Sequence, residues 1–340
     1  MRASGARSGR GWMVLAAAVG MAAPVTAESA IVFQRSTGPQ DRMYIAGNDG
    51  TGVHRLPVAG GSPTISPDGT RLAYQAATRA APLRILTLAT GAVVTPAGGC
   101  QAQVTWSPDS TRLLCQTQTV DRRDFVTGNG LLLVDAAAGT VTTLVAARGN
   151  SVDTFGWSPD GTRVAYSRGR FGGARTDVFV ADPAGTVAPR RVITDATGPV
   201  WGPRRIAVTR YTHRRVRVGA IPDDVVHSQI WTVNPGGGGA HRLTHDPVPP
   251  FLIEGPSADR WTPDGTRLVA SVTGTDYGRL ITVDAASGRT RGLQPGGELI
   301  AALVGMSPDG RSLLVNEGIV EPHTRLRVVG IGGRRGRVLL

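Results

Sequence analysis

Arginine is the side chain that gives this sequence most of its capacity to bind a charged ligand. The chain has 37 basic residues, all of them arginine, against 25 acidic ones, and a formal net charge of +12. A guanidinium group presents a planar fork of donors that matches carboxylate and phosphate oxygens. The candidate binding residues lie in irregular stretches and comprise Arg122, Arg123, Arg168, Arg170, Tyr211, His213, Arg214, Arg215 and Arg217. They predict a site for an anionic ligand or an acidic protein. The simpler interpretation, solvated arginine in an arginine-biased chain, is favoured by about two to one.

The sequence lacks the residue patterns that would indicate catalysis or metal binding. His241 and His245 are four residues apart, but on a strand that spacing is about 13 Å, too long for one zinc ion. The chain has no Gly-x-Ser-x-Gly motif, which would mark the nucleophile of a propeller-linked peptidase. Glycine-rich phosphate loops and aspartate-rich calcium loops are absent from the sequence as well. We therefore expect no catalytic residues, no metal, no cofactor and no enzymatic activity.

Cys100 and Cys115 are the two cysteines, and they bracket one predicted hairpin. If Trp106 opposes Thr111, Cys115 faces Ala102, and Cys100 comes within reach when the strand carries a small bulge. A disulfide between the two cysteines is therefore a candidate, and detection of two free thiols by mass spectrometry would exclude it.

The elements that must position these residues come from an internal repeat. The phrase Ser-Pro-Asp-Gly-Thr-Arg recurs in intact or altered form around prolines 67, 108, 159, 203, 263 and 308. Proline fixes the first corner of a turn, aspartate bonds to the local backbone, and glycine takes a positive φ, so the phrase predicts a hairpin. A second pair of short strands follows each hairpin. Four short strands every 40 to 60 residues are typical of a propeller blade.

The count of units gives an all-β, single-domain β-propeller with seven blades, of which the first is incomplete. Six blades are the alternative. Glycine and proline together make up 69 residues of the chain (46 and 23), which suits many strands joined by tight turns. The tryptophans that open several repeats are Trp106, Trp157, Trp201 and Trp261, and we expect them to pack between blades rather than to stack on a ligand.

Segments such as Ile65 to Tyr74 resemble the WD40-like (PD40) repeats of the TolB family of periplasmic propellers. The resemblance covers nearly all of residues 31–340 and implies a propeller fold. Members of such families act as protein-interaction platforms, and others stand in front of peptidase domains. This chain has no separate α/β domain before its repeats, which departs from the TolB pattern and argues against a role in that system.

Residues 1–27 have the order of a secretory signal peptide: a basic start, an apolar run from Trp12 to Ala23, and a small-x-small site ending at Ala27. Residues 28–340 then form the propeller. We expect an exported protein, located in the periplasm, the cell envelope or outside the cell. Cleavage would leave no transmembrane span, although an uncleaved anchor is the alternative. An exported chain makes nucleic acid an unsuitable partner despite the basic charge.

The segments that connect the repeats are expected to carry the function. In an up-and-down blade, the connections at 117–129, 167–176, 211–228 and 316–323 fall on one face, opposite the short repeated turns. The main functional prediction is a monomeric module that binds an envelope or extracellular protein, or a polymer, through this long-loop face. The alternative prediction is a propeller-type hydrolase or lyase with its site on the same face.

Overall fold

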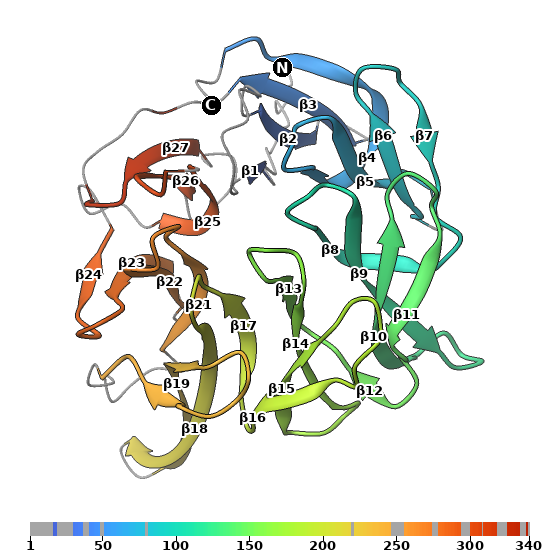
Figure 1. Ribbon diagram of the computed structural model, residues 1–340. Helices are drawn as coiled ribbons and strands as arrows, with labels where there is room; N and C mark the ends of the chain where they lie inside the picture. The colour runs from blue at the N-terminus through green and yellow to red at the C-terminus, as the bar shows by residue number, and fades with distance from the viewer. Residues whose placement is uncertain are drawn as a thin grey trace, which may run out of the picture.

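The computed structural model describes residues 16–18, 30–36, 41–47, 51–78, 81–218, 221–245, 255–273, 278–293, 300–307, 309–317, 325–333 and 338. Its sheets are arranged as a ring around a central channel (Figure 1). The all-β propeller predicted from the repeats is thereby confirmed. In the described part of the chain every regular element is a strand.

The strands form six sheets. The first contains β1 (Ala16–Ala18), β2 (Ala30–Ser36), β3 (Asp41–Gly47), β4 (His54–Ile65), β5 (Arg71–Ala76), β6 (Leu83–Thr87) and β7 (Val93–Val94). The second contains β8 (Cys100–Trp106), β9 (Arg112–Val120), β10 (Val126–Asp135) and β11 (Val141–Val145). The third contains β12 (Asn150–Ser151), β13 (Phe155–Trp157), β14 (Val164–Arg170), β15 (Thr176–Ala181) and β16 (Arg190–Ile193).

The remaining three sheets complete the ring. The fourth contains β17 (Thr197–Trp201), β18 (Ile206–Val218), β19 (Ile221–Val233) and β20 (His241–Arg242). The fifth contains β21 (Pro256–Trp261), β22 (Arg267–Thr273), β23 (Gly278–Asp284) and β24 (Thr290–Gly292). The sixth contains β25 (Ile300–Met306), β26 (Ser312–Glu317) and β27 (Arg325–Gly330).

The number of sheets corrects the seven-blade expectation in favour of six. The cause is β4, a single strand of 12 residues that pairs with β3 near its start and with β5 near its end. Two repeat units that the sequence separates are thus joined in one sheet of seven strands. Its first strand, β1, lies inside the predicted signal peptide and pairs with β2. Residues 1–15 and 19–27 of that segment lie outside the described residues.

The repeated turns are held by a small network of hydrogen bonds. In the third sheet the hydroxyl of Ser158 donates to Asp160 at 2.5 Å and accepts the backbone N–H of Arg163 at 2.9 Å. Gly161 has a φ of 69°, a value that favours glycine over residues with a side chain. The hydroxyl of Ser158 lowers the pKa of Asp160, and the backbone N–H of Thr162 adds to this effect. Each turn is therefore a self-contained structural unit.

Three of the four tryptophans of the repeat join neighbouring sheets, as expected. Trp106, Trp157 and Trp261 are at most 8 % exposed. Each indole N–H donates to a backbone carbonyl of the preceding sheet; these pairs are Trp106–Thr64 at 3.1 Å, Trp157–Thr105 at 3.3 Å and Trp261–Val200 at 3.1 Å. The indole both fills the space between sheets and fixes their relative position.

The altered repeat at residues 201–205 has a packing reason. A Cβ atom at Gly202 would lie 2.9 Å from the ring carbons of Trp261. Other repeats have serine or threonine at the corresponding position, for example Ser158 and Thr262. Glycine here lets the backbone of one sheet lie directly against the indole of the next.

The ends of the ring meet at a seam between the first and sixth sheets. Ile31, Phe33 and Ala46 of the first sheet pack with Leu314 and Leu326 of the sixth in one apolar cluster. Among the described strands, no hydrogen-bonded ladder connects these two sheets. Side-chain packing therefore closes the ring at this point (Figure 1).

Two connections predicted as long loops are extended hairpins instead. Strands β18 and β19 pair continuously from Ile206↔Val233 to Val218↔Ile221. Strands β9 and β10 pair up to Val120↔Val126. The alternation of arginine and valine at residues 214–218 is a strand pattern, and it continues the ladder beyond the sheet.

Candidate functional site

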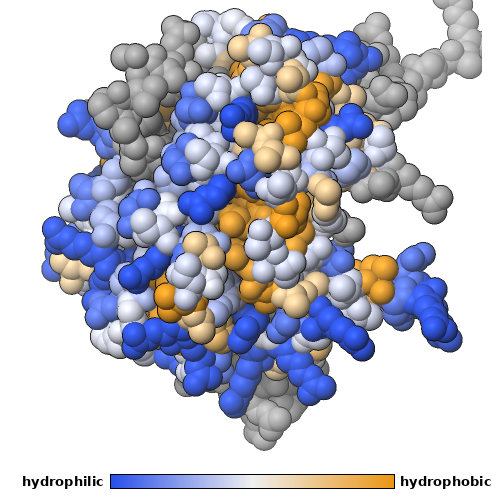
Figure 2. Space-filling model, turned by 45° about the vertical axis from the view of Figure 1, so that its right-hand side comes forward, coloured by the Kyte–Doolittle hydropathy of each residue, from blue (hydrophilic) through white to orange (hydrophobic). Residues whose placement is uncertain are grey.

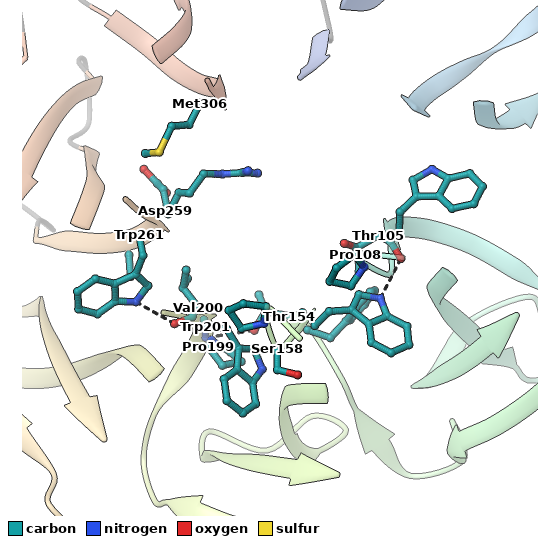
Figure 3. A pocket seen from close by; sticks show the side chains of 18 of the residues that line it. Thr105, Pro108, Thr154, Ser158, Pro199, Val200, Trp201, Asp259, Trp261 and Met306 are labelled. Atoms are coloured by element: carbon teal, nitrogen blue, oxygen red, sulfur yellow. Dashed lines mark hydrogen bonds between the residues drawn. The ribbon is translucent and has the colours of Figure 1, made fainter. Parts of the chain in front are cut away.

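The clearest cavity lies at the centre of the ring, at the end where the repeated turns are found. It has a volume of about 600 Å³ and is lined by the inner strands and turns of successive sheets. Its walls carry aromatic and proline side chains: Trp106, Trp157, Trp201, Trp261, Pro67, Pro108, Pro159, Pro199, Pro203 and Pro263. Figure 3 shows Thr105, Thr154, Val200, Asp259 and Met306 around this central space. We call it the channel pocket.

Among the described residues that line the channel pocket, Asp259 and Arg260 are the charged ones. Both belong to β21, which carries a bulge: Ala258 pairs with Ala270 and Arg260 with Val269, so that Asp259 is the extra residue. A bulge changes the direction in which side chains point, which is why bulges are frequent next to functional sites. It explains how two consecutive residues both reach the pocket wall.

The Asp259 carboxyl group is held in a desolvated position. Burial raises its pKa to about 6, although a hydrogen bond from the Ser271 hydroxyl and the charge of Arg260 favour the ionised form. Both hydrogen bond and charge act against the shift, so desolvation is the dominant cause. Asp259 therefore titrates close to neutral pH.

Arg260 has no anionic partner among the described residues. The ion pairs found there are Arg175–Asp195 and Arg191–Asp177, so Arg260 is in neither. Burial lowers the pKa of Arg260, and the nearby Asp259 opposes this shift. An arginine remains charged in such surroundings, so its guanidinium brings to the pocket wall a positive charge that forms no ion pair with the described residues.

The arginines predicted as binding residues lie elsewhere. Arg122 and Arg123 are exposed in the turn between β9 and β10. Figure 1 places this hairpin and the β18–β19 hairpin at separate parts of the rim. Neither arginine lines the channel pocket.

The remaining candidates are divided between two other sheets. Arg168 lies with its guanidinium carbon 4.2 Å from the ring centre of Phe179, a structural cation–π contact, and Arg170 is exposed. Tyr211 is 52 % exposed on β18. The backbone of β18 also carries His213, Arg214, Arg215 and Arg217, whose side chains lie outside the described residues. The described candidates therefore do not form one surface with the pocket.

Cys100 and Cys115 form a disulfide with a Cα–Cα distance of 5.5 Å. Trp106 faces Leu113 rather than Thr111, and a bulge between Cys100 and Val104 shifts the register so that Cys100 lies opposite Thr117. Both cysteines are buried in the core of the second sheet. The bond thus pins the inner strand β8 to β9.

The described residues contain neither a candidate metal-binding cluster nor a candidate membrane-spanning helix. Three or more histidine, cysteine, aspartate or glutamate side chains do not come together there in a way that could hold a metal ion. In the same residues no helix is long and apolar enough to cross a membrane.

The sequence contained a signal for Asp259 and Arg260 that the repeat analysis missed. The residue before the tryptophan position of the repeat is threonine, glycine or valine at Thr105, Gly156 and Val200, but arginine at Arg260. The preceding residue is likewise apolar in other repeats, for example Val104 and Phe155, but aspartate at position 259. A comparison of the repeats at these two positions would have identified the fifth sheet as different.

Comparison with known proteins supports the fold and changes the functional interpretation. No family model matches the chain, and no curated protein matches it. Among solved structures, the β-propeller domain of the Trilobed protease from Pyrococcus furiosus has a TM-score of 0.64 at 13 % identity, with 96 % of this chain and 98 % of that chain covered. The Pyrococcus horikoshii acylaminoacyl peptidase has a TM-score of 0.64 at 13 % identity over 94 % of this chain and 52 % of its own.

A puromycin hydrolase has a TM-score of 0.68 at 15 % identity, with 98 % of this chain and 54 % of that chain covered. The chain therefore spans about half the length of these last two proteins (52 % and 54 %). Since these structural neighbours are the propeller domain of a protease, a peptidase and a hydrolase, the prediction of a non-enzymatic binding module is wrong.

Proposed function

We propose that this chain is the propeller of a peptidase-type hydrolase and that the channel pocket receives a segment of the peptide substrate. The observation that carries the proposal is the pocket itself, about 600 Å³ at the centre of a fold that peptidase propellers share. In this proposal the propeller admits and orients the peptide. A hydrolase module that meets the propeller breaks the bond.

The chemistry of the pocket wall suits a peptide. Exposed prolines such as Pro159, Pro203 and Pro263, together with the partly exposed Trp201, offer apolar surfaces for side chains and for extended backbone. The polar side chains of Gln103 and Thr105 lie in the same wall and can orient polar groups of a peptide. Figure 2 shows, in its own view, apolar side chains gathered in a band across the middle of the molecule and bordered by hydrophilic ones.

We place the protein outside the cytoplasm, as an exported member of the TolB-like propellers. The order of residues 1–27 supports export, and the disulfide between Cys100 and Cys115 suits an oxidising compartment. The partner in this proposal is the hydrolase module, and a periplasmic or extracellular location would give it access to peptides there.

Gly156 offers a way to test the proposal by blocking the pocket. It lines the pocket, and a Cβ atom at this position would meet nothing within 4 Å. Gly156→Phe should therefore obstruct the pocket without disturbing the sheet. Gly292 on β24 is a matched control, because it is exposed, equally unobstructed and outside the pocket lining.

The experiment compares peptide hydrolysis by extracts of source cells with and without the gene for this chain. Mass spectrometry of a defined peptide mixture should show a loss of cleavage without the chain. Wild-type protein and Gly292→Phe should restore cleavage, whereas Gly156→Phe should not. A benzophenone-labelled peptide should crosslink to β8, β13, β17 or β21. Unchanged hydrolysis together with no crosslink at these strands would refute the proposal.

A further inference from the structure

The fifth sheet is the one whose side chains bring charge to the wall of the channel pocket, among the described residues. The position before the repeat tryptophan is occupied by the uncharged residues Thr105, Gly156 and Val200 in three sheets. Arg260 occupies the same position in the fifth sheet and contributes a long cationic side chain. A pocket lined by otherwise uncharged groups thus has one charged side.

The guanidinium group of Arg260 has no bonded partner among the described residues. No ion pair, hydrogen bond or cation–π contact of its guanidinium involves a described residue. Asp259 is adjacent, but its carboxyl group accepts a hydrogen bond from Ser271, and the two side chains form no ion pair. A guanidinium on a pocket wall without a hydrogen-bonded partner can take its counter-charge from a ligand.

We propose that Arg260 binds a carboxylate group of the ligand in the channel pocket, and that Asp259 weakens this binding when it is ionised. This inference rests on the proposed function and adds a substrate class to it, namely peptides that present a carboxylate to β21. The carboxylate can belong to the C-terminus of the peptide or to an acidic side chain, because both have the same planar pair of oxygens. Arg260 would accommodate either in a forked arrangement.

The role of Asp259 follows from its position beside the guanidinium. Its pKa of about 6 means that it carries a charge at pH 8 and is neutral at pH 5. A ligand carboxylate remains ionised at pH 5, since its own pKa is near 4. Repulsion between the two carboxylates is therefore removed on acidification, and binding becomes tighter.

Three other charged or titratable groups lie on strands that pack against β21 or pair with it. Arg210 of β18 lies 4.7 Å over the ring of Trp231 and donates to the carbonyl of Asp195. Arg267 is at the far end of β22 and pairs with Asp284 in the ladder, and His227 is buried on β19. None of the three lines the channel pocket.

The test measures the affinity of three short peptides for the full chain by isothermal titration calorimetry. One peptide has a free C-terminal carboxylate, the second has an amidated C-terminus and one glutamate, and the third is amidated with glutamine in place of glutamate. At pH 5 at least one of the two carboxylate peptides should bind about tenfold or more tightly than the neutral one. Comparison of the first two identifies the source of the carboxylate.

The variant Arg260→Gln should abolish the preference, whereas Arg260→Lys should retain part of it. Arg291→Gln on the exposed strand β24 is the control, because it removes the same charge outside the pocket. The preference should decrease about threefold or more between pH 5 and pH 8 in the wild type, and Asp259→Asn should remove this pH dependence.

The outcomes separate the two proposals. Equal affinity for acid and neutral peptides, with binding blocked by Gly156→Phe, would overturn the carboxylate site and leave the peptide pocket in place. A preference that persists in a folded Arg260→Gln protein would overturn it as well. Absence of binding by all three peptides would overturn both proposals. If Arg260→Gln does not fold, two other results decide. The carboxylate site is supported if Arg260→Lys retains part of the preference and the preference of Asp259→Asn does not change with pH. It is overturned if either result is not obtained.

Discussion

Asp259 shows how one residue links the pocket to the stability of the fold. Its folded pKa of about 6 lies above the value of about 3.9 for an unfolded aspartate. The folded state therefore holds this proton more tightly than the unfolded state does. The contribution of Asp259 to stability is fully present below pH 4 and is lost as the pH rises through 6.

Replacement of this carboxyl group should therefore stabilise the protein at alkaline pH. Asp259→Asn keeps an acceptor for the Ser271 hydroxyl and removes the charge. At pH 8 we expect a gain in the free energy of unfolding of about 1–3 kcal/mol over wild type, with little difference at pH 4. Guanidinium chloride denaturation of both proteins at the two pH values measures it. A variant that is less stable than wild type at pH 8 would contradict the desolvation of Asp259.

Residue-level prediction from the sequence was the least successful. The arginines were selected because they lay in predicted loops, but Arg168 instead packs on Phe179 and Arg122 is solvent-exposed. Asp259 and Arg260 were missed because their exposure to the channel depends on a bulge, which a repeat pattern does not reveal. The direction of a side chain at a bulge is a tertiary property.

At the scale of elements, the altered repeat makes a sharp test of inter-sheet packing. Restoring the usual residue with Gly202→Ser should destabilise the protein, because its Cβ would lie 2.9 Å from the Trp261 ring. The ring is fixed by its own hydrogen bond to Val200, so the strain cannot be relieved by a simple rotation. We expect a loss of about 1–3 kcal/mol in the free energy of unfolding, measured by denaturation.

Gly292→Ser is the control for this substitution, since nothing lies within 4 Å of its Cβ position. It should change the free energy of unfolding by less than about 0.5 kcal/mol. Comparable stability of Gly202→Ser and wild type would mean that the sheets are not packed as closely as the structure indicates.

The sequence predicted the hairpin turns and the inter-sheet tryptophans because both depend on local chemistry. Serine, aspartate and glycine at fixed spacing specify the turn, as Ser158, Asp160 and Gly161 show. The length of the hairpins was underestimated at β18 and β19, where charged residues were taken as loop. Alternation continued through those charges, and cross-strand pairing extended the ladder.

At the scale of the molecule, the seam between the first and sixth sheets is the expected point of opening. Leu326 is fully buried in its apolar cluster. Leu326→Ala should destabilise the protein by about 2–4 kcal/mol and raise amide hydrogen exchange selectively in β2 and β27. Mass spectrometry of exchange in peptic fragments measures the effect.

Leu113→Ala is the matched control, because Leu113 is equally buried but lies in the second sheet. It should lower stability without a selective increase in exchange at β2 and β27. An even rise around the ring in Leu326→Ala would show that the seam is no weaker than the other inter-sheet contacts.

The overall ring was predictable because the repeat recurs, whereas the number of separate sheets was not. The sequence of each half of β4 predicts an ordinary short strand. In the structure the two halves are one continuous strand, and this joins two repeat units. Gly60, Gly61 and Pro63 are residues typical of a loop, so the local sequence predicts a break where the structure has one continuous strand.

The shared strand β4 also has a mechanical consequence. A force applied to the two ends of the chain would first part the seam, where packed side chains hold the described strands together, and would then unzip the sixth sheet by itself. In the first sheet, the two repeat units joined by β4 cannot unfold one after the other, because β4 transmits the force from β3 to β5. In single-molecule pulling they should rupture as one large step, while the remaining sheets give smaller and more uniform ones.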